Sequence, residues 1–294
     1  MMSNVKSQIS NIISIDIILF CYRQEQYIEQ ALRSIYAQEL PKDVNARIIV
    51  ADDASPDNTL AIIKRLAPES PFPMTFLSEE PNMGISKNYK RSFAATEADY
   101  VAILEGDDYW LPNHLAQHIE FLCAHPECSM SMNEISYLHE HKNALELGKM
   151  FWPNDKNYAL INVQKQISEG NQLGNLSACI FRGQYLRDLL DSLFEIPIAD
   201  WIIGIMLALR GDIAILKGST SVYRFKESGV WAGQSRIRQH FKMLHYADMY
   251  DRLLGGKYHA EWKRFKCSCW RDVRRNWMHY MPHWLQKWWH KIKK

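Results

Sequence analysis

The sequence predicts an α/β fold built on a parallel sheet, followed by a helical C-terminal extension. Strand-like and helix-like patterns alternate over the first 110 residues, and strands joined by helices of this length form right-handed crossovers between parallel strands. Residues 101–104 are four consecutive apolar residues without a polar face, as expected of a strand buried on both sides. From about residue 235 the chain turns helical, basic and aromatic.

The alternating elements can be assigned in order along the first part of the chain. Apolar residues at helical spacing predict a helix over residues 24–37. Ser55 followed by Pro56 predicts the N-cap and first position of a second helix. Further patterns predict strands at 12–20, 48–51, 74–77 and 101–104, and helices at 86–94 and 111–123.

Size and composition are those of an ordinary globular protein, with 294 residues, of which 47% are hydrophobic and 23% charged. This length suits one large domain, or one domain with an appendage. We see no apolar run of the ~18 residues that a membrane span needs, and Asp16 interrupts the apolar N-terminal run, which argues against a signal peptide. Six scattered cysteines fit a reducing compartment, so a cytoplasmic location is expected.

The net charge of +2 hides an asymmetry between body and tail. Residues 257–294 carry eleven lysines and arginines against two acids, a net charge of +9, which leaves −7 for the rest. The acidic body argues against nucleic acid as a partner. Six of the ten tryptophans also lie in the tail, so the body and the tail are expected to have different roles.

A cluster of acids follows directly on the apolar run at 101–104. Glu105, Asp107 and Asp108 stand there, with Gly106 between the first two. In an open α/β sheet, ligands bind outside the carboxyl ends of the strands. Carboxylates and phosphate oxygens are the ligands that Mg²⁺ takes in proteins. The cluster therefore predicts a site for a divalent cation on one side and a diphosphate on the other.

Two other predicted strands end in residues of interest. The first ends in Phe20 and Tyr22, and an aromatic ring at a sheet edge either stacks on a base or packs in the core. The second ends in Asp52 and Asp53, acids that suit the positive end of the helix after them. Capping of that helix accounts for a serine at position 55. It accounts only in part for two adjacent aspartates before it.

Together these segments resemble family 2 glycosyltransferases with the GT-A fold, of the bacterial surface-polysaccharide type. The resemblance covers about residues 12–235, and it depends on the order and spacing of the motifs more than on any one of them. The matching segments are 17–22, 31–38, 48–59, 82–88, 104–110, 199–201, 207–211, 223–224 and 229–231.

The resemblance implies a domain over residues 1–235, with a nucleotide-sugar half at about 12–124 and an acceptor half at about 125–235. The helical, tryptophan-rich extension then covers 236–294. The implied activity is inverting transfer of a hexosyl or related group from a UDP-sugar to a hydroxyl of a glycan or lipid-linked acceptor, with Mg²⁺ or Mn²⁺ as cofactor. The implied setting is lipopolysaccharide, O-antigen or capsule synthesis.

The resemblance also implies roles for individual residues. Tyr22 and Asp52 would contact the base, and Asp107 with Glu105 would hold the metal. Asp200 falls at the position of the catalytic base, although an N-cap of the apolar helix after it is equally compatible with its place in the sequence. The full nucleotide-binding set is Phe20, Tyr22, Arg23, Asp52, Lys87, Glu105 and Gly106, and the donor-sugar set is Asp108 and Trp110.

Two departures from the family pattern concern this site. Arg23 replaces the usual asparagine after the tyrosine, which leaves the contacts to the base open. Phe225 stands where relatives often have a histidine, which removes one ligand for metal or phosphate.

Two alternatives to this function are weaker. A sugar-phosphate nucleotidyltransferase normally has a glycine-rich basic loop after its first strand, and residues 21–24 form no such loop. A non-catalytic nucleotide-sugar or membrane-binding protein of the same fold would not need Glu105, Asp107 and Asp200 together.

The C-terminal tail has the pattern of a helix that lies in a membrane interface. An apolar tryptophan face with a cationic border is typical of such helices. The tail could instead dock on the catalytic body or form an oligomer contact. The candidate interface residues are Trp277, Trp284, Trp288, Trp289, Lys287 and Lys291.

Overall fold

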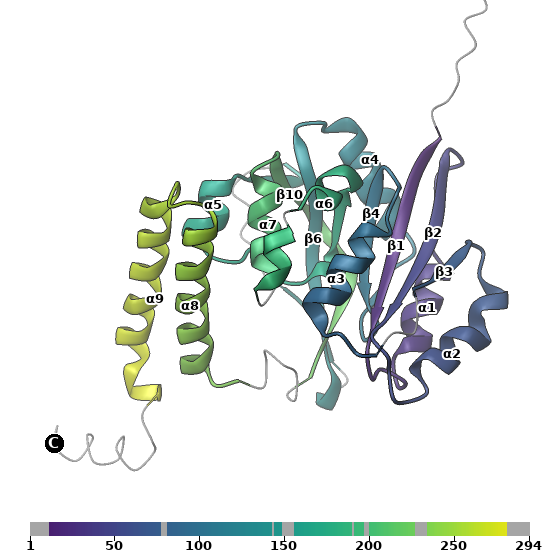
Figure 1. The fold of residues 1–294 in the computed structure, drawn as a ribbon, viewed down its shortest axis with the longest axis horizontal. Coiled ribbons are helices and arrows are strands. Elements are labelled where there is room, and N and C mark those ends of the chain that lie inside the picture. Colours follow the sequence, from purple (N-terminus) through teal and green to yellow (C-terminus); the bar gives the residue numbers. More distant parts are fainter. Residues whose placement is uncertain are drawn as a thin grey trace, which may run out of the picture.

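The computed structural model describes residues 12–77, 81–142, 144–148, 156–189, 191–196, 200–226 and 234–280. In this part of the chain, helices cover both faces of one mixed sheet, and a helical hairpin stands beside it (Figure 1). The predicted α/β class with a C-terminal helical extension is therefore confirmed.

The strands are β1 (Ile13–Cys21), β2 (Val44–Asp52), β3 (Met74–Phe76), β4 (Tyr100–Glu105), β5 (Tyr109–Trp110), β6 (Cys128–His139), β7 (Ala144–Leu147), β8 (Tyr158–Ile161), β9 (Cys179–Arg182) and β10 (Asp212–Phe225). The α-helices are α1 (Ile28–Tyr36), α2 (Thr59–Leu66), α3 (Ile85–Ala94), α4 (His114–Ala124), α5 (Val163–Ser168), α6 (Gly183–Arg187), α7 (Asp200–Ala208), α8 (Arg236–Leu253) and α9 (His259–Tyr280). Short 3₁₀ helices are η1 (Ala67–Glu69), η2 (Glu140–Lys142), η3 (Leu176–Ala178) and η4 (Asp191–Glu195).

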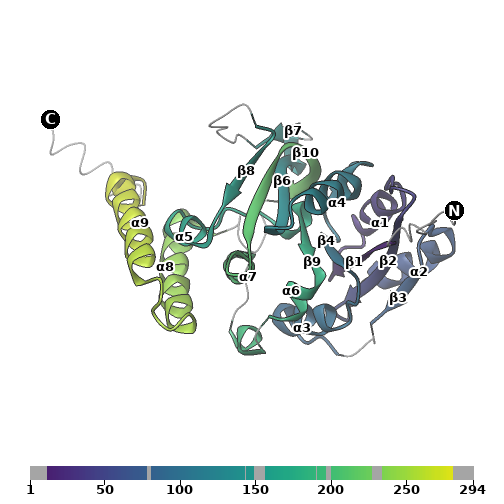
Figure 2. The same cartoon turned by 90° about the horizontal axis from the view of Figure 1, so that it is seen from above.

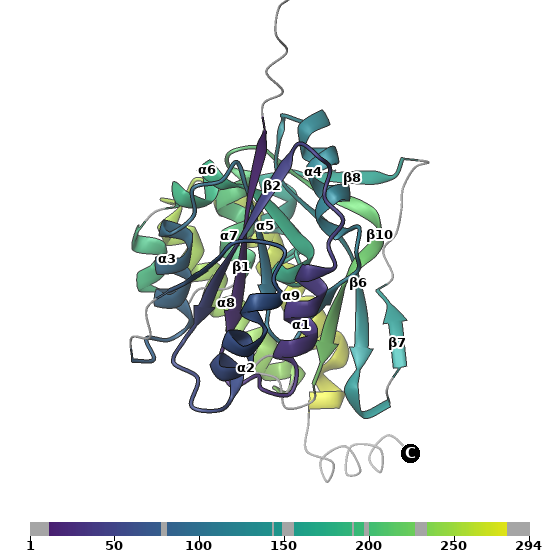
Figure 3. The same cartoon turned by 90° about the vertical axis from the view of Figure 1, so that its right-hand side faces the viewer.

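The sheet has a parallel half and a mixed half. Its strand order is β3-β2-β1-β4-β9-β6-β10-β5, and the first four strands are parallel. The strand β9 runs antiparallel to both β4 and β6, so it joins the two halves. The strand β7 pairs with β6, and β8 pairs with β10 (Figure 3). The parallel half is thus the type of sheet that the alternating patterns predicted.

Two hydrophobic cores lie on opposite faces of the sheet. One packs α1, α2 and α4 on one face. The other packs α3, α6 and α7 on the opposite face, and there it continues into α8 and α9 (Figure 2). The strand β1 supplies side chains to both cores in alternation, as Ile17 and Ile18 illustrate. Burial on both faces explains why β1 and β4 are almost continuously apolar.

Helix starts are where the sequence prediction was least accurate. The second helix begins at Thr59 rather than after Ser55, because the Ser55 hydroxyl bonds to the Asp52 carboxylate and does not cap the helix. The first helix begins at Ile28, because Gln24 first forms a turn in which its carbonyl accepts from the Tyr27 amide at 2.9 Å.

The extension packs on the body through an aromatic cluster. Trp201 of α7 meets Tyr250 of α8 and Trp262 and Phe265 of α9, with ring centroids 4.7 to 5.8 Å apart. Trp262 and Tyr250 are fully buried. The docked arrangement weighed for the tail therefore holds for the first half of α9.

The interface candidates of the tail are not located by the structure. The side chain of Trp277 lies outside the described residues, as do Trp284, Lys287, Trp288, Trp289 and Lys291. Among the helices that are described, none is both long and apolar enough to cross a membrane.

Candidate active site

The predicted site segments converge at one edge of the parallel sheet. Register pairs Cys21 of β1 with Asp52 of β2, and Phe20 with Glu105 of β4. All three strands therefore end together, and the segments that follow them meet outside the same edge. The sequence predicted this convergence from the parallel topology.

The loops after β1 and β2 are joined by hydrogen bonds. The Arg23 amide donates to the Ser55 hydroxyl at 3.1 Å, and the Ser55 amide donates to Asp52 at 2.9 Å. Arg23 and Ala54 both have positive φ, of 57° and 56°, a strained conformation for residues with a side chain. Such strain is common at ligand sites. Tyr22, the predicted base contact, is 43% exposed beside this junction.

The second aspartate of the pair has a separate task. Asp53 is buried, and its carboxylate accepts from the amides of Met83 and Gly84 at 2.9 and 3.0 Å. Asn82 in turn donates to the Asp53 carbonyl at 2.9 Å. Asp53 thus fixes the turn that precedes α3, which explains the adjacent aspartates that helix capping explained only in part.

Gly106 lies in close contact with the start of α1. A Cβ atom at this position would stand 2.4 Å from the Gln24 side-chain oxygen and 2.9 Å from the end of the Ile28 side chain. Any larger residue would therefore require these two side chains to move, including the Gln24 side chain that bonds to Asp107.

Asp107 is held by a cation of the chain itself. Its carboxylate accepts a hydrogen bond from the Lys226 ammonium at 2.7 Å and one from the side-chain amide of Gln24 at 3.1 Å. The side chains of Asp107 and Lys226 are both 21% exposed. A lysine ammonium thus occupies the position next to Asp107 that was predicted for a metal.

The ring of Tyr27 lies beside the two cations near Asp107. Lys226 and Arg224 lie 4.3 and 4.6 Å from the centroid of its ring, within the range of cation–π attraction. Arg224 also donates to the Asp107 carbonyl at 2.9 Å. Sequence reasoning included Tyr27 only as a residue of the helix predicted over residues 24–37, and it missed Lys226. The available signal was strand alternation, which puts Arg224 and Lys226 on one side of the end of β10.

Asp108 and Trp110, which the sequence predicted as donor-sugar contacts, are both buried. Asp108 is 1% exposed and accepts from Asn175, Ser177 and the Arg224 amide at 2.6 to 2.9 Å. Trp110 is 3% exposed and donates to the Ser177 carbonyl. Both anchor η3 and β10 behind the acidic loop.

Burial and the neighbouring charge of Asp107 raise the pKa of Asp108 to about 7. The three hydrogen bonds that it accepts act in the opposite direction.

Phe20 and Lys87 were also predicted to contact the nucleotide, and the structure places them in the core and on an exposed helix face. Phe20 is buried against Tyr89 and Phe93, with centroids 4.4 and 6.4 Å apart, so it packs in the core rather than offering a face for a base. Lys87 is exposed on α3. Of the predicted site residues that the structure describes, only Glu105 and Asp200 line the cavity described next.

Glu105 and Asp200 line one cavity of about 680 Å³. They are almost a hundred positions apart in the sequence, and β4 and α7 bring them together on the face that carries α8 and α9. Tyr89 and Tyr223 also line the cavity, and the Tyr89 hydroxyl is 3.4 Å from Glu105. The remaining lining includes Glu169, Asn171, Asn175, Gln239, His240, Lys242, Met243, Tyr246, Phe265 and Cys269.

The electrostatics of this cavity favour an added cation. Burial raises the pKa of Glu105 well above its usual value, and the charges of Asp108, Asp107 and Asp200 raise it further. Burial also raises the pKa of Asp200, although the Asn171 side chain and the Trp201 amide donate to its carboxylate and partly offset this effect. Asp200 is the first residue of α7. This position is compatible with both roles considered from the sequence, a catalytic base and a cap at the start of the helix.

The donor set fits a metal that takes few protein ligands. Within the described residues, no group of three or more histidine, cysteine or acidic side chains is placed to hold an ion. Mg²⁺ is usually bound through one or two carboxylates together with substrate phosphates and water. Asp107, which already attracts an ammonium, and Glu105, which lies among other acids, match that requirement.

The sequence profile of Glycosyl transferase family 2 matches residues 16–182, more than half of the chain. A Mycobacterium tuberculosis protein, Rv1520, is 29% identical over 229 residues, which are 76% of this chain and 62% of that protein. The chain thus spans less than two thirds of the length of this relative.

Solved structures share the fold. S. aureus TarS in complex with UDP-GlcNAc is similar with a TM-score of 0.57 at 17% identity, over 80% of this chain and 66% of that one. The mannosyltransferase PcManGT from Pyrobaculum calidifontis, in complex with GDP-Man and Mn²⁺, is similar with a TM-score of 0.56 at 17% identity, over 81% of this chain and 64% of that one.

Proposed function

The chain belongs to glycosyl transferase family 2 and has the GT-A fold, and on this premise we propose that it transfers a sugar from a UDP-sugar to a hydroxyl of a glycan or lipid-linked acceptor. The observation that carries the proposal is the meeting of Glu105 and Asp200 in one cavity. We assign Glu105 to the side of the donor diphosphate and Asp200 to the proton of the acceptor hydroxyl.

The reaction we propose is a single displacement with inversion. The acceptor oxygen forms a bond to the anomeric carbon, the bond from that carbon to the diphosphate breaks, and the nucleoside diphosphate leaves with the electron pair. The hydroxyl proton passes to the Asp200 carboxylate, which Asn171 and the Trp201 amide hold in place. Its raised pKa makes it a better proton acceptor than an exposed aspartate.

The donor side carries the charge of the leaving group. Bound Mg²⁺ or Mn²⁺ would supply a Lewis acid that neutralises the diphosphate, and Asp107 and Glu105 are the residues we propose to hold it. The PcManGT complex contains Mn²⁺, which supports the choice of metal. Tyr22 and Asp52 remain our candidates for the base, since both stand at the ends of their strands. Tyr22 is 43% exposed, whereas Asp52 is buried and accepts from the Ser55 amide and hydroxyl.

A donor screen tests this function. Each nucleotide-sugar of a panel (UDP-GlcNAc, UDP-glucose, UDP-galactose and GDP-mannose) is added with Mn²⁺, and the Tm is measured. A donor at about 100 times its Kd stabilises the folded chain by about 2.7 kcal/mol, which raises the Tm by several degrees. The matching free sugars serve as controls. A Tm that no nucleotide-sugar moves contradicts the proposal.

For the setting, we propose bacterial surface-glycan synthesis (lipopolysaccharide, O-antigen or capsule) at the inner face of the cytoplasmic membrane, with the tail as the membrane contact. The net charge of +9 over residues 257–294 supports this contact, as do the tryptophans of this segment other than Trp262, which is buried against the body. A lipid-linked acceptor would then be presented at the surface to which the enzyme is attached.

Deletion of residues 277–294 is expected to reduce co-sedimentation with anionic vesicles. The deleted segment contains four lysines, and each cation near an anionic surface contributes about 1 kcal/mol. The full chain is measured beside the deletion on vesicles of phosphatidylglycerol and phosphatidylcholine, with pure phosphatidylcholine as control. Equal sedimentation of the two chains would assign the tail to docking or to an oligomer contact instead.

A further inference from the structure

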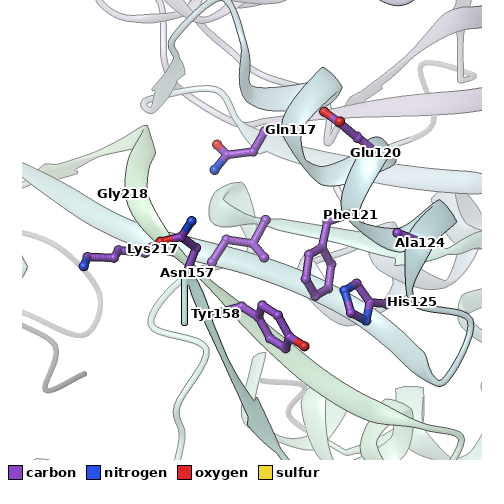
Figure 4. A pocket seen from close by; sticks show the side chains of 10 residues that line it. Gln117, Glu120, Phe121, Ala124, His125, Asn157, Tyr158, Lys217 and Gly218 are labelled. Carbon is purple, nitrogen blue, oxygen red and sulfur yellow. The ribbon is translucent and has the colours of Figure 1, made fainter. Parts of the chain in front are cut away.

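A second cavity, of about 550 Å³, lies on the other face of the sheet. It is formed by α4 together with the ends of β8 and the middle of β10 (Figure 4). Its rings of Phe121 and Tyr158 pack on the core under α1, α2 and α4, whereas the cavity of Glu105 and Asp200 borders the core on the opposite face. We refer to it as the back-face cavity.

Three rings form an aromatic wall in the back-face cavity. Phe121 and His125 of α4 are stacked at 4.2 Å, and Tyr158 of β8 meets them at 5.1 and 4.9 Å. All three side chains are half-buried, so each keeps part of its surface open to the cavity. The Phe121 and His125 rings are nearly parallel, at 20°, and the Tyr158 ring stands at 65° and 59° to them, so the three rings form a corner rather than one plane. Because packing already holds these rings, they require little further ordering when a ligand binds.

Polar groups stand beside the aromatic wall. The Gln117 side-chain oxygen is buried and has no hydrogen-bond partner among the described residues. A buried acceptor without a donor is costly, and a ligand hydroxyl would relieve that cost. Asn157 adds an exposed amide, which both donates and accepts. Figure 4 shows Gln117 and Asn157 next to the ring cluster.

The charges at the cavity are mixed in sign. Glu120 and Lys217 both line it, and Figure 4 shows their charged ends turned away from the rings. The carboxylate of Glu120 opposes an anionic ligand, and Lys217 opposes a cationic one. A neutral ligand with both an apolar face and hydroxyl groups fits the lining better than either.

We propose that the back-face cavity is a binding site for one sugar unit of a glycan chain, separate from the catalytic cavity. A pyranose ring packs its C–H face on the aromatic wall, while its hydroxyls donate to the Gln117 oxygen and exchange hydrogen bonds with Asn157. The identity of the bound chain as a substrate or product of the enzyme rests on the proposed function. The presence of the sugar site does not.

Direct binding of neutral trisaccharides tests the site. Maltotriose, cellotriose and chitotriose are titrated separately into the full chain, and binding is followed by saturation-transfer NMR. We expect at least one of them to bind. Tyr158→Leu is expected to weaken that binding about fivefold, the effect of losing an aromatic contact of about 1 kcal/mol.

Gln117→Leu provides a second variant that does not threaten the fold. It removes an acceptor that has no partner, so stability is expected to hold, while sugar binding weakens severalfold. Phe76→Leu is the matched control, because Phe76 is a 38% exposed ring on β3 at the far edge of the sheet. That variant is expected to bind the trisaccharide as the unmodified chain does.

The outcomes separate this site from the catalytic one. Excess UDP is expected to leave the trisaccharide signal unchanged. Loss of the signal with UDP, or retention of full affinity by both Tyr158→Leu and Gln117→Leu, would place the sugar elsewhere and overturn the proposal, as would no binding by any of the three sugars. Failure of the donor screen with trisaccharide binding intact would reject the proposed function alone.

Discussion

Replacement of Asp200 by asparagine is expected to lower turnover by roughly 10²–10⁴-fold, the usual contribution of a general base, with little change in donor affinity. The amide keeps the size of the carboxylate and can still accept from the Trp201 amide, as Asp200 does at 3.0 Å, but it cannot take the acceptor proton. Because burial already raises the pKa of Asp200, a neutral replacement is not expected to destabilise the chain.

The measurement compares turnover with the Tm shift produced by the donor. Glu169→Gln serves as the matched control, because Glu169 lines the same cavity and its side chain is about half exposed. This control is expected to stay within a few fold of the unmodified chain. Turnover by Asp200→Asn at the unmodified rate would show that Asp200 only supports the start of α7.

The second large effect concerns Asp107 and its lysine. Asp107→Asn is expected to weaken Mn²⁺ binding in the presence of UDP by at least about tenfold, since loss even of an indirect partner costs 10–100-fold at metal sites. Lys226→Met is expected to strengthen it severalfold, because the ammonium 2.7 Å from the Asp107 carboxylate competes with the ion. Free Mn²⁺ is followed by electron paramagnetic resonance, which does not depend on turnover.

Mn²⁺ binding weakens in Asp107→Asn and strengthens in Lys226→Met only if the Lys226 ammonium and the metal compete for the same carboxylate, that of Asp107. Lys217→Met is the control, because Lys217 is exposed on β10 away from Asp107 and lines the back-face cavity instead. Weaker Mn²⁺ binding by Lys226→Met would mean that Lys226 helps to hold the diphosphate beside the metal. Unchanged Mn²⁺ binding by Asp107→Asn would remove Asp107 from the proposed metal site.

The parallel half of the sheet was predictable because its signals are local. A short apolar run such as residues 101–104 favours a strand buried on both faces, and parallel strands bring their carboxyl ends to one edge. That reasoning predicted that the segments with Asp52 and Glu105 meet at the same edge of the sheet. The register of β1 with β2 and β4 agrees with it.

Side-chain direction at that edge was not predictable from the pattern. Asp107 and Asp108 are adjacent, yet one is partly exposed beside Lys226 and the other is buried behind the loop. The difference arises from Asn175, Ser177 and the Arg224 amide, which reach Asp108 from segments far along the chain. Such long-range hydrogen bonds leave no periodic signal in the sequence.

The extension shows a similar limit. Its charge and tryptophans suggested a role separate from the body, and the proposed domain boundary near residue 235 remains a prediction. The structure nevertheless makes α8 and α9 part of the cavity of Glu105 and Asp200, through Tyr246 and Phe265 among others. This arrangement results from the packing of apolar side chains between α7 and the hairpin. Composition alone does not reveal which aromatic residues face inward.

The docking of Trp201 against the hairpin has a practical consequence for anyone who expresses this enzyme in pieces. A fragment cut at residue 235 would lose the two helices that line one side of the cavity of Glu105 and Asp200, and it would leave the Trp201 ring and its neighbours in the same core open to water. Exposed apolar surface of this kind promotes aggregation. The shortest useful enzyme therefore has to retain both helices of the hairpin, and chimaeras that exchange the hairpin between relatives offer a route to altered acceptor choice.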